Sequence, residues 1–264
     1  MSDISIFCRR PFMGKGKMMA VSSMIRGEQV AERLGAKLNP KEGYDNDVCI
    51  YVKPSGNKFE GRPYIDVVDE EGPVIRNPDV PAIACSEFSY KVLSKFNPKK
   101  LVLIPQQHCN FERAKRTREG VKAVGMVAQR EAFPLVPKEI ATGLAEKGIE
   151  FVQYSTFRTR QDIVDFYNRI DVQLIWRPFN LKLGNPLKLV NAMSFGVPTI
   201  ALPDDGILEL DGFYLSAGSP SEVSTQLDRL IREPDLYEEY SQKGLEKAEQ
   251  YHIDNICKLY KELL

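Results

Sequence analysis

The sequence has few of the side chains that bind transition metals. It contains two histidines, His108 and His252, among 264 residues, and its five cysteines are scattered without the spacing of zinc ligands. We therefore expect no metal site. An odd number of cysteines, with no secretory signal before them, predicts free thiols in the cytoplasm.

Long apolar runs and an excess of charge of one sign are also absent. No stretch approaches the roughly 18 apolar residues of a membrane-spanning helix, so no transmembrane segment is expected. Lys plus Arg number 36, as do Asp plus Glu, and the formal net charge is zero. A neutral chain is not expected to have nucleic acid as its main partner, although a local basic groove stays open.

The remaining composition, 43% hydrophobic and 27% charged, is that of an ordinary globular protein. Strand-like apolar runs alternate with amphipathic stretches, which predicts parallel sheets covered by helices. In the first half, strands are predicted at 4–8, 47–52, 64–68, 83–85 and 101–104, and helices at 25–38 and 87–96. In the second half, strands are predicted at 123–127, 150–154, 171–176, 197–202 and 213–215, and helices at 137–147, 161–168, 186–195, 221–231 and 235–263, the last one broken near Ile253.

A polar stretch without periodicity, near 105–118, separates the two alternations and is typical of a connection between domains. We therefore predict an α/β protein with two Rossmann-like domains that face each other across a cleft. The N-terminal domain is expected at 1–112 and the C-terminal domain at 113–245, with a final helix at 246–264 that crosses back to the first domain. Ligands of such sheets bind outside the carboxyl ends of the strands, so functional residues are expected in the loops there.

The most informative stretch runs from Leu183 to Leu202, LGNPLKLVNAMSFGVPTIAL. Asn185 is expected at the N-cap of a short helix, and Pro186 at its first position. The backbone N–H groups at 185–188 then lack helical partners at a positive dipole end, which favours an anion. A helix that simply starts in water is the alternative.

Basic residues gather in the expected carboxyl-end loops of the second domain, and together they favour phosphate over a merely solvated surface. They are Arg130, Arg158, Arg160, Arg177, Lys182 and, in the first turn of the helix, Lys188. Asp204 and Asp205 follow the next strand, where a loop turn explains them better than a cation site. His108, among polar neighbours, is a candidate general acid or base.

Two further patterns are weaker. Gly14, Lys15 and Gly16 follow the first strand, but too far from it for a dinucleotide fingerprint, so we interpret them as a loop that brings N–H groups and a cation to the ligand, or as plain surface. Ser194 lies in a sequence similar to a nucleophile elbow, yet here the helix precedes the serine instead of following it. We therefore expect no serine nucleophile.

The second half resembles the C-terminal domain of retaining glycosyltransferases with two Rossmann domains, as in glycosyltransferase family 4. The segments that carry the resemblance are KAVGMVAQ, DIVDFYNRIDVQLIWRP and LGNPLKLVNAMSFGVPTIALPDDGILEL, within about residues 120–260. The N-terminal half is similar only in the order of its elements, and it is short for this fold. The size fits a compact bacterial or virally encoded member, the latter acting in the host cytoplasm.

The resemblance implies a hexosyltransferase that uses a nucleotide-diphosphate sugar without metal or cofactor and retains the anomeric configuration. GDP-mannose is the favoured donor and a UDP-sugar the next, while the acceptor would be a glycan, glycoprotein or glycolipid. The resemblance implies catalytic roles for His108, Arg130 and Lys182, and a base and ribose site at Ser155, Thr156, Phe157 and Asn191. It implies donor and diphosphate contacts at Gly14, Lys15, Gly16, Arg26, Gly125, Arg130, Lys182, Gly184, Asn185, Pro186, Leu187 and Lys188.

One departure keeps alternatives open. Leu183 and Asn191 occupy the two positions where the family usually has glutamates. Asn191 can still bond a ribose hydroxyl through its amide, whereas Leu183 offers no polar contact to the sugar. The alternatives are an epimerase of the same fold, a catalytically weak nucleotide-sugar-binding protein, and a DNA-modifying glycosyltransferase with a basic patch at 113–118. A homodimer is compatible with any of these.

Overall fold

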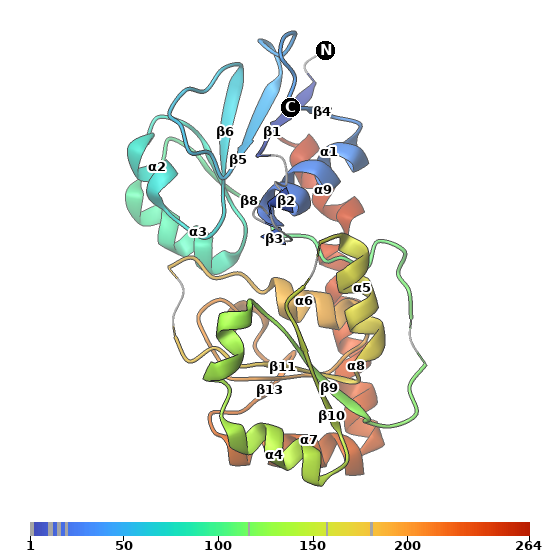
Figure 1. Ribbon diagram of the computed structural model, residues 1–264. Helices are drawn as coiled ribbons and strands as arrows, with labels where there is room; N and C mark the ends of the chain where they lie inside the picture. Colours follow the sequence, from blue (N-terminus) through green and yellow to red (C-terminus); the bar gives the residue numbers. More distant parts are fainter. Residues whose placement is uncertain are drawn as a thin grey trace. The chain divides into compact units, whose positions relative to one another are not determined.

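The computed structural model describes residues 3–9, 13–14, 17–18, 21–115, 117–156, 158–179 and 182–264 (Figure 1). It divides into two compact units. Unit 1 comprises Met1–Gln107, Leu181–Asn185 and Ile253–Leu264, and unit 2 comprises His108–Asn180 and Pro186–His252. The chain thus changes unit at 107/108 and 252/253, where the sequence placed the boundaries at 112/113 and 245/246. It also leaves unit 2 for the short segment before Pro186.

Unit 1 is built on a six-stranded parallel sheet of order β4-β1-β5-β6-β7-β8 (Figure 1). Its strands are β1 (Ile4–Phe7), β4 (Lys37–Leu38), β5 (Val48–Val52), β6 (Arg62–Val67), β7 (Ala82–Ala84) and β8 (Leu101–Leu103). The central strands are apolar on both faces, as expected of a sheet covered by helices. The predicted helix at 25–38 is too long, because Gly35 ends α1 (Gln29–Leu34) in a left-handed conformation and residues 37–38 form the edge strand β4.

The other elements of unit 1 are the hairpin β2 (Met13–Gly14) and β3 (Lys17–Met18), the π-helix η1 (Ser23–Glu28), α1 (Gln29–Leu34), α2 (Gly72–Arg76), α3 (Glu87–Leu93), the 3₁₀ turn η2 (Ser94–Phe96) and α9 (Ile253–Lys261). Ser86 caps α3, because its side chain accepts a hydrogen bond from the Ser89 backbone N–H at 3.0 Å. Helix α9 packs against α1, so the C-terminal segment is part of unit 1.

Arg26 is fully buried in unit 1 and joins three of its elements. Its Nε lies 2.8 Å from both carboxylate oxygens of Asp66 on β6, and the hydroxyl of Tyr260 on α9 donates to Asp66 Oδ2 at 2.9 Å. This geometry corrects the expected donor contact of Arg26. The guanidinium is committed to a buried ion pair, so it braces the C-terminal helix instead of meeting a ligand.

Unit 2 is built on a five-stranded parallel sheet of order β10-β9-β11-β12-β13. Its strands are β9 (Ala123–Val127), β10 (Glu150–Tyr154), β11 (Val172–Ile175), β12 (Thr199–Ala201) and β13 (Leu215–Ser216). Its helices are η3 (Arg130–Leu135), α4 (Lys138–Glu146), α5 (Arg160–Arg169), α6 (Leu187–Ser194), η4 (Leu208–Leu210), α7 (Pro220–Arg232), α8 (Pro234–Ala248) and η5 (Glu249–Tyr251). Two parallel α/β sheets are thereby confirmed.

Alternate residues of β9 enter two different cores in unit 2. Val124 and Met126 pack with α4 and α7 on one face, whereas Ala123 and Val127 pack with α5 and α6 on the other. Gly125 lies between the latter two. A Cβ there would stand 2.8 Å from Ile170 Cδ1 and 2.9 Å from Phe166 Cζ. The glycine is therefore needed for close packing of α5, and the expected donor contact at Gly125 stays a prediction.

No helix among the described residues is long and apolar enough to cross a bilayer.

Candidate functional site: the carboxyl edge of the second sheet

The connectivity of unit 2 reverses direction at β9. This strand pairs with β10 on one side and with β11 on the other, so the loops after β9 and β11 diverge from the same point of the sheet. Ligands of open parallel sheets bind outside such a switch point. Arg130 follows β9 and Arg177 follows β11, which places two arginines at this edge.

Helix α6 starts at the same edge, and its N-cap residue makes no side-chain cap bond. The N-cap is Pro186 and the first helical residue is Leu187. The helix therefore begins one residue later than the sequence predicts. Because proline has no side-chain acceptor, no side-chain cap bond is formed. Asn185 is consequently not the N-cap. The first-turn N–H groups and the positive end of the helix dipole remain suited to an anion.

Two cations and one carboxylate meet near this helix start. Arg177 donates a hydrogen bond from Nε to Asp204 Oδ2 at 2.9 Å, and its terminal nitrogen forms an ion pair with the same oxygen at 2.8 Å. Asp204, in the loop after β12, is buried, and its Oδ1 accepts a hydrogen bond from the Gly206 N–H at 2.8 Å. Lys188, in the first turn of α6, feels the charges of both residues.

The Lys188 ammonium forms no hydrogen bond or ion pair within the part of the chain that the structure describes. Burial, and to a smaller extent repulsion from Arg177, lower the pKa of Lys188 to about 8, against a smaller opposing effect of Asp204. Its backbone is fixed by Tyr167, whose buried hydroxyl donates to the Lys188 carbonyl at 3.1 Å. A half-buried lysine with a lowered pKa, beside an arginine and at a helix start, favours an anion site in this unit.

Asn191 lies one turn further along α6 and is buried. Its Oδ1 accepts a hydrogen bond from the Cys109 N–H at 2.8 Å, and its side chain is also hydrogen-bonded to Tyr167. The amide therefore ties the segment after His108 to α6. Its predicted contact with a ribose stays a prediction, and the side chain has protein partners already.

The loop between β10 and α5 contains the expected base site. Ser155 is half-buried and Thr156 exposed, whereas Phe157 lies outside the described residues. The loop ends in a capping box, in which Thr159 Oγ1 accepts from Asp162 N at 3.3 Å and Asp162 Oδ2 accepts from Thr159 N at 2.7 Å. The loop is thus anchored at the start of α5, at the carboxyl edge of the sheet.

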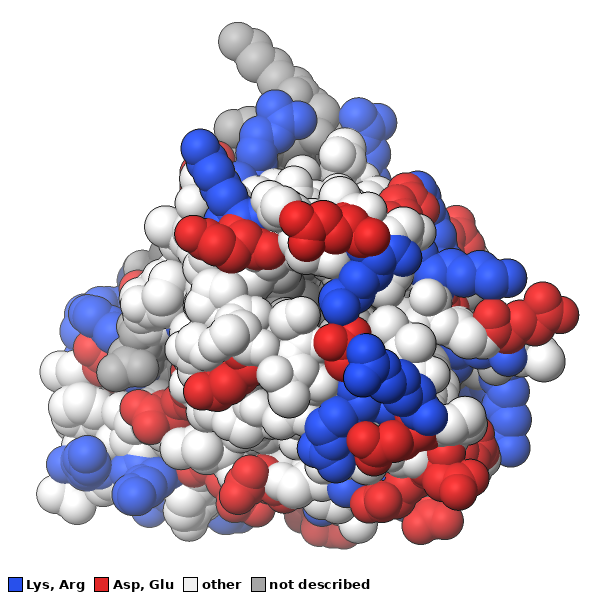
Figure 2. Space-filling view, turned by 90° about the horizontal axis from the view of Figure 1, so that it is seen from below, with Lys and Arg blue, Asp and Glu red and all other residues white. Residues whose placement is uncertain are grey.

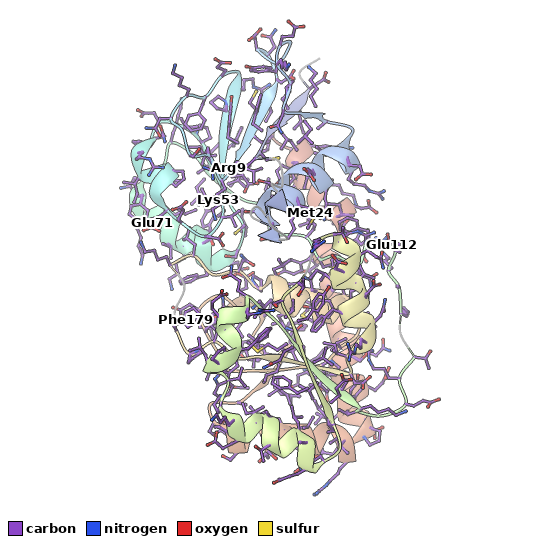
Figure 3. The ribbon with its side chains drawn as sticks, viewed as in Figure 1. Arg9, Met24, Lys53, Glu71, Glu112 and Phe179 are labelled. Carbon is purple, nitrogen blue, oxygen red and sulfur yellow. The ribbon has the colours of Figure 1, made fainter. Side chains whose placement is uncertain are left out.

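Other side chains at this edge differ in whether protein groups already bind them. Arg130 is exposed and makes no ion pair among the described residues, whereas Arg160 is held by Glu112 at 2.7 Å and by the Cys109 carbonyl at 2.7 Å. Phe179, two residues after Arg177, is 48% exposed, and Figure 3 labels it together with Glu112. Such an exposed aromatic ring can stack on a base. No pattern in the sequence singles out Phe179.

His108 lies inside unit 2 and is 3% exposed. Its Nδ1 accepts from the Asn110 N–H at 3.1 Å, and its ring stands edge-on to His252 with centroids 5.3 Å apart. Burial lowers the pKa of His108 to about 3, with smaller effects from nearby charges, so the ring is neutral. This geometry favours a structural role over the catalytic one that was expected.

The loop before α6 belongs to unit 1. Leu183 is buried in the unit 1 core with Ile65 and Leu93, and the Gly184 carbonyl accepts from Ser86 Oγ at 2.7 Å. The exposed Lys182 lies 3.5 Å from Glu71 Oε1. The predicted roles of Lys182 and Gly184 in binding diphosphate stay predictions, and both residues group with the first unit instead of with α6.

The carboxyl edge of the first sheet is also polar. Arg9, Lys53 and Glu71 follow β1, β5 and β6 and lie in the same part of unit 1 (Figure 3). Gly14 is in the β2–β3 hairpin, whereas Lys15 and Gly16 lie outside the described residues. No cluster of three His, Cys, Asp or Glu side chains suited to a metal occurs among the described residues.

Figure 2 shows basic and acidic side chains interspersed over the face that it draws, with no broad patch of one sign.

No protein-family model matches the chain. An uncharacterized glycosyltransferase of Haemophilus influenzae is 33% identical over 87 residues, which cover 31% of this chain and 25% of that protein. The match thus spans about a quarter of the relative's length.

Solved structures share the fold over nearly the whole chain. Anabaena Alr3699/HepE in complex with UDP and glucose has a TM-score of 0.64 at 12% identity, covering 100% of this chain and 99% of that one. A glycosyltransferase of Rickettsia africae reaches 0.67 at 11% identity, covering 99% and 97%. The DNA-modifying enzyme β-glucosyltransferase, solved with and without uridine diphosphoglucose, reaches 0.55 at 12% identity, covering 98% of each chain. At these identities the likeness shows the fold, that of two-domain glycosyltransferases.

Proposed function

We propose that this protein is a glycosyltransferase, a hexosyltransferase that takes its sugar from a nucleotide-diphosphate donor. The observation that carries the proposal is Lys188, a half-buried residue whose pKa is lowered and which feels the charge of Arg177 in the first turn of α6. A half-buried cation beside a second cation is less stable than one in water, and a bound anion would offset that cost. A diphosphate supplies two adjacent charges for the two cations and the helix dipole.

In the proposed transfer, the bond between the anomeric carbon and the β-phosphate oxygen breaks. A bond forms from the anomeric carbon to an acceptor hydroxyl oxygen, and the proton of that hydroxyl passes to the departing diphosphate or to solvent. Negative charge grows on the departing diphosphate, so Arg177, Lys188 and the α6 N–H groups would stabilise it. Arg130, at the neighbouring strand end, would add a third cation. With these cations in place, we propose that no metal ion is required.

The nucleoside would lie beside the loop after β10. Ser155 and Thr156 offer hydroxyl groups there, and the exposed ring of Phe179 suits stacking on a base. We propose UDP-sugars as the first donors to test, since HepE was solved with UDP and glucose and the β-glucosyltransferase with uridine diphosphoglucose. GDP-mannose and retention of configuration, both implied by the resemblance to family 4, stay part of the proposal.

The acceptor would be a hydroxyl of a glycan, glycoprotein or glycolipid, bound by the polar loops of unit 1. A second candidate function is nucleotide-sugar binding with weak or no turnover. Leu183 favours it, because this residue, at a position where the family has a glutamate, is buried in the unit 1 core. An epimerase of the same fold remains the third candidate.

The test is calorimetric titration with UDP, GDP, UDP-glucose and GDP-mannose, first with chelator and then with Mg²⁺. We expect at least one nucleotide sugar to bind without metal. No binding by any of the four would contradict the proposal, and binding only with Mg²⁺ would contradict metal independence. NMR of the product formed on a glycan acceptor then reads its anomeric configuration and separates transfer from mere binding or epimerisation.

A further inference from the structure

Asp204 puts a negative charge inside the proposed diphosphate site. It is buried, and both of its carboxylate oxygens are occupied, Oδ2 by the two Arg177 nitrogens at 2.8 and 2.9 Å and Oδ1 by the Gly206 N–H at 2.8 Å. Its charge also reaches Lys188, whose pKa it raises against the effect of burial. An anion-binding site would hold its ligand more tightly without this carboxylate, so its presence calls for a reason.

The charges of donor and product differ by about one unit. The diphosphate of a nucleotide sugar is esterified at both ends and carries two negative charges. Once the sugar has left, the terminal phosphate of the product has a second ionisation near pH 6 and gains a third charge. A site made only of Arg177, Lys188 and a helix N-terminus would therefore bind the product more tightly than the donor.

We propose that Asp204 sets the charge selectivity of the site, lowering its affinity for the nucleoside diphosphate product relative to the nucleotide-sugar donor. The inference rests on the proposed function and adds a specificity-determining residue to it. With Arg177 and Lys188 protonated and Asp204 ionised, the three side chains sum to one positive charge. A site with this net charge binds the doubly charged donor but disfavours the third negative charge of the product. Release of the product is therefore faster.

Asp204 also positions Arg177, because Oδ2 accepts a hydrogen bond from Nε and forms an ion pair with the terminal nitrogen. Positioning alone would change the affinities for donor and product by similar factors, since both carry the diphosphate. Charge selectivity instead changes their ratio. The ratio of the two dissociation constants is therefore the readout that separates the two roles.

The test compares UDP and UDP-glucose by calorimetry in the full chain and its Asp204→Asn variant, which keeps a side-chain acceptor for the Gly206 N–H but removes the charge. We expect the affinity for UDP to rise about tenfold relative to that for UDP-glucose. Asp205→Asn is the matched control, because Asp205 is adjacent and exposed, and its ratio should equal that of the wild type. An unchanged ratio in Asp204→Asn overturns the inference.

Two further measurements keep the inference testable if Asp204→Asn does not fold. Asp204→Ser keeps a hydroxyl at the same turn and should shift the ratio in the same direction. In the wild type, the UDP to UDP-glucose affinity ratio should change by less than about threefold as the terminal phosphate ionises between about pH 5.5 and 7.5. A tenfold rise overturns the inference. If neither nucleotide binds the wild type, the proposed function fails, and with it the basis of the inference.

Discussion

At the scale of single residues, Lys188 is the group whose protonation controls the proposed site. Its pKa is about 8 in the free protein, because burial and Arg177 disfavour the ammonium. A bound diphosphate favours the ammonium and raises that pKa. We therefore predict that the affinity for UDP is constant below about pH 7 and falls above pH 8, by at most about tenfold per pH unit.

Calorimetry from about pH 6.5 to 9.5 measures this profile, since UDP keeps a constant charge over most of that range. The Lys188→Met variant should bind UDP weakly and with little pH dependence, because the group that titrates is gone. A wild-type affinity that stays constant up to pH 9.5 would show that Lys188 does not contact the ligand.

Gly125, which is expected at the donor, is also required for packing. A methyl group there would collide with Ile170 and Phe166, whereas a methyl group at Gly143, in α4, meets nothing within 4 Å. We predict that Gly125→Ala lowers the free energy of unfolding by about 1–3 kcal/mol. Gly143→Ala should raise it by up to about 1 kcal/mol, because alanine favours a helix. Urea titration measures both, and equal effects would contradict this account of Gly125.

At the scale of elements, the segments by which the chain enters and leaves unit 2 are joined to each other. His108 and His252 lie at these two points, and the His108 N–H donates to the Tyr251 carbonyl at 3.1 Å. Arg113 donates to His252 Nδ1 at 3.0 Å and to Glu249 Oε1 at 2.7 Å, so charged groups surround the ring pair. The histidines thus hold two chain segments together.

This arrangement predicts sensitivity to acid. His108 has a pKa of about 3 in the folded protein and about 6.5 when unfolded, so below pH 6.5 the unfolded chain binds a proton that the folded chain does not. The free energy of unfolding should therefore fall as pH drops from about 6.5 toward 3, at up to about 1.4 kcal/mol per pH unit from this residue. Urea titrations at several pH values measure the slope. His108→Gln should have a shallower slope, and an identical slope in both proteins would contradict the prediction.

The bounds of helix α6 follow from its own sequence, whereas the contacts of the loop before it depend on distant residues. Its apolar positions and the glycine after it predict a helix at 186–195, and the structure has one at Leu187–Ser194. The loop before it is different. Gly184 and Leu183 take their partners from Ser86, Ile65 and Leu93 in unit 1. These partners are roughly a hundred residues away along the sequence, so no local sequence pattern predicts the contacts.

At the scale of the whole molecule, the alternation of strands and helices was sufficient to predict two parallel sheets, because each strand is apolar and each helix amphipathic on its own. Long-range polar pairing was not predictable. Arg26 was expected at a ligand and is instead paired with Asp66 in a buried bridge. Asp204 was interpreted as a loop turn, which it is, but its ion pair with Arg177 depends on the neighbouring strands β11 and β12. The sequence therefore predicts which edge of the sheet carries the proposed site better than it predicts the roles of individual residues.

The most direct test of the central claim is the affinity of UDP or GDP for Lys188→Met compared with Lys122→Met. Both variants lose one lysine charge from unit 2, but Lys122 is exposed and directly precedes β9, at the amino edge of the same sheet. We predict that Lys188→Met weakens the binding of the preferred nucleotide at least about tenfold, while Lys122→Met leaves it unchanged. Equal affinities in the two variants, with both folded, would contradict the assignment of the diphosphate site to the start of α6.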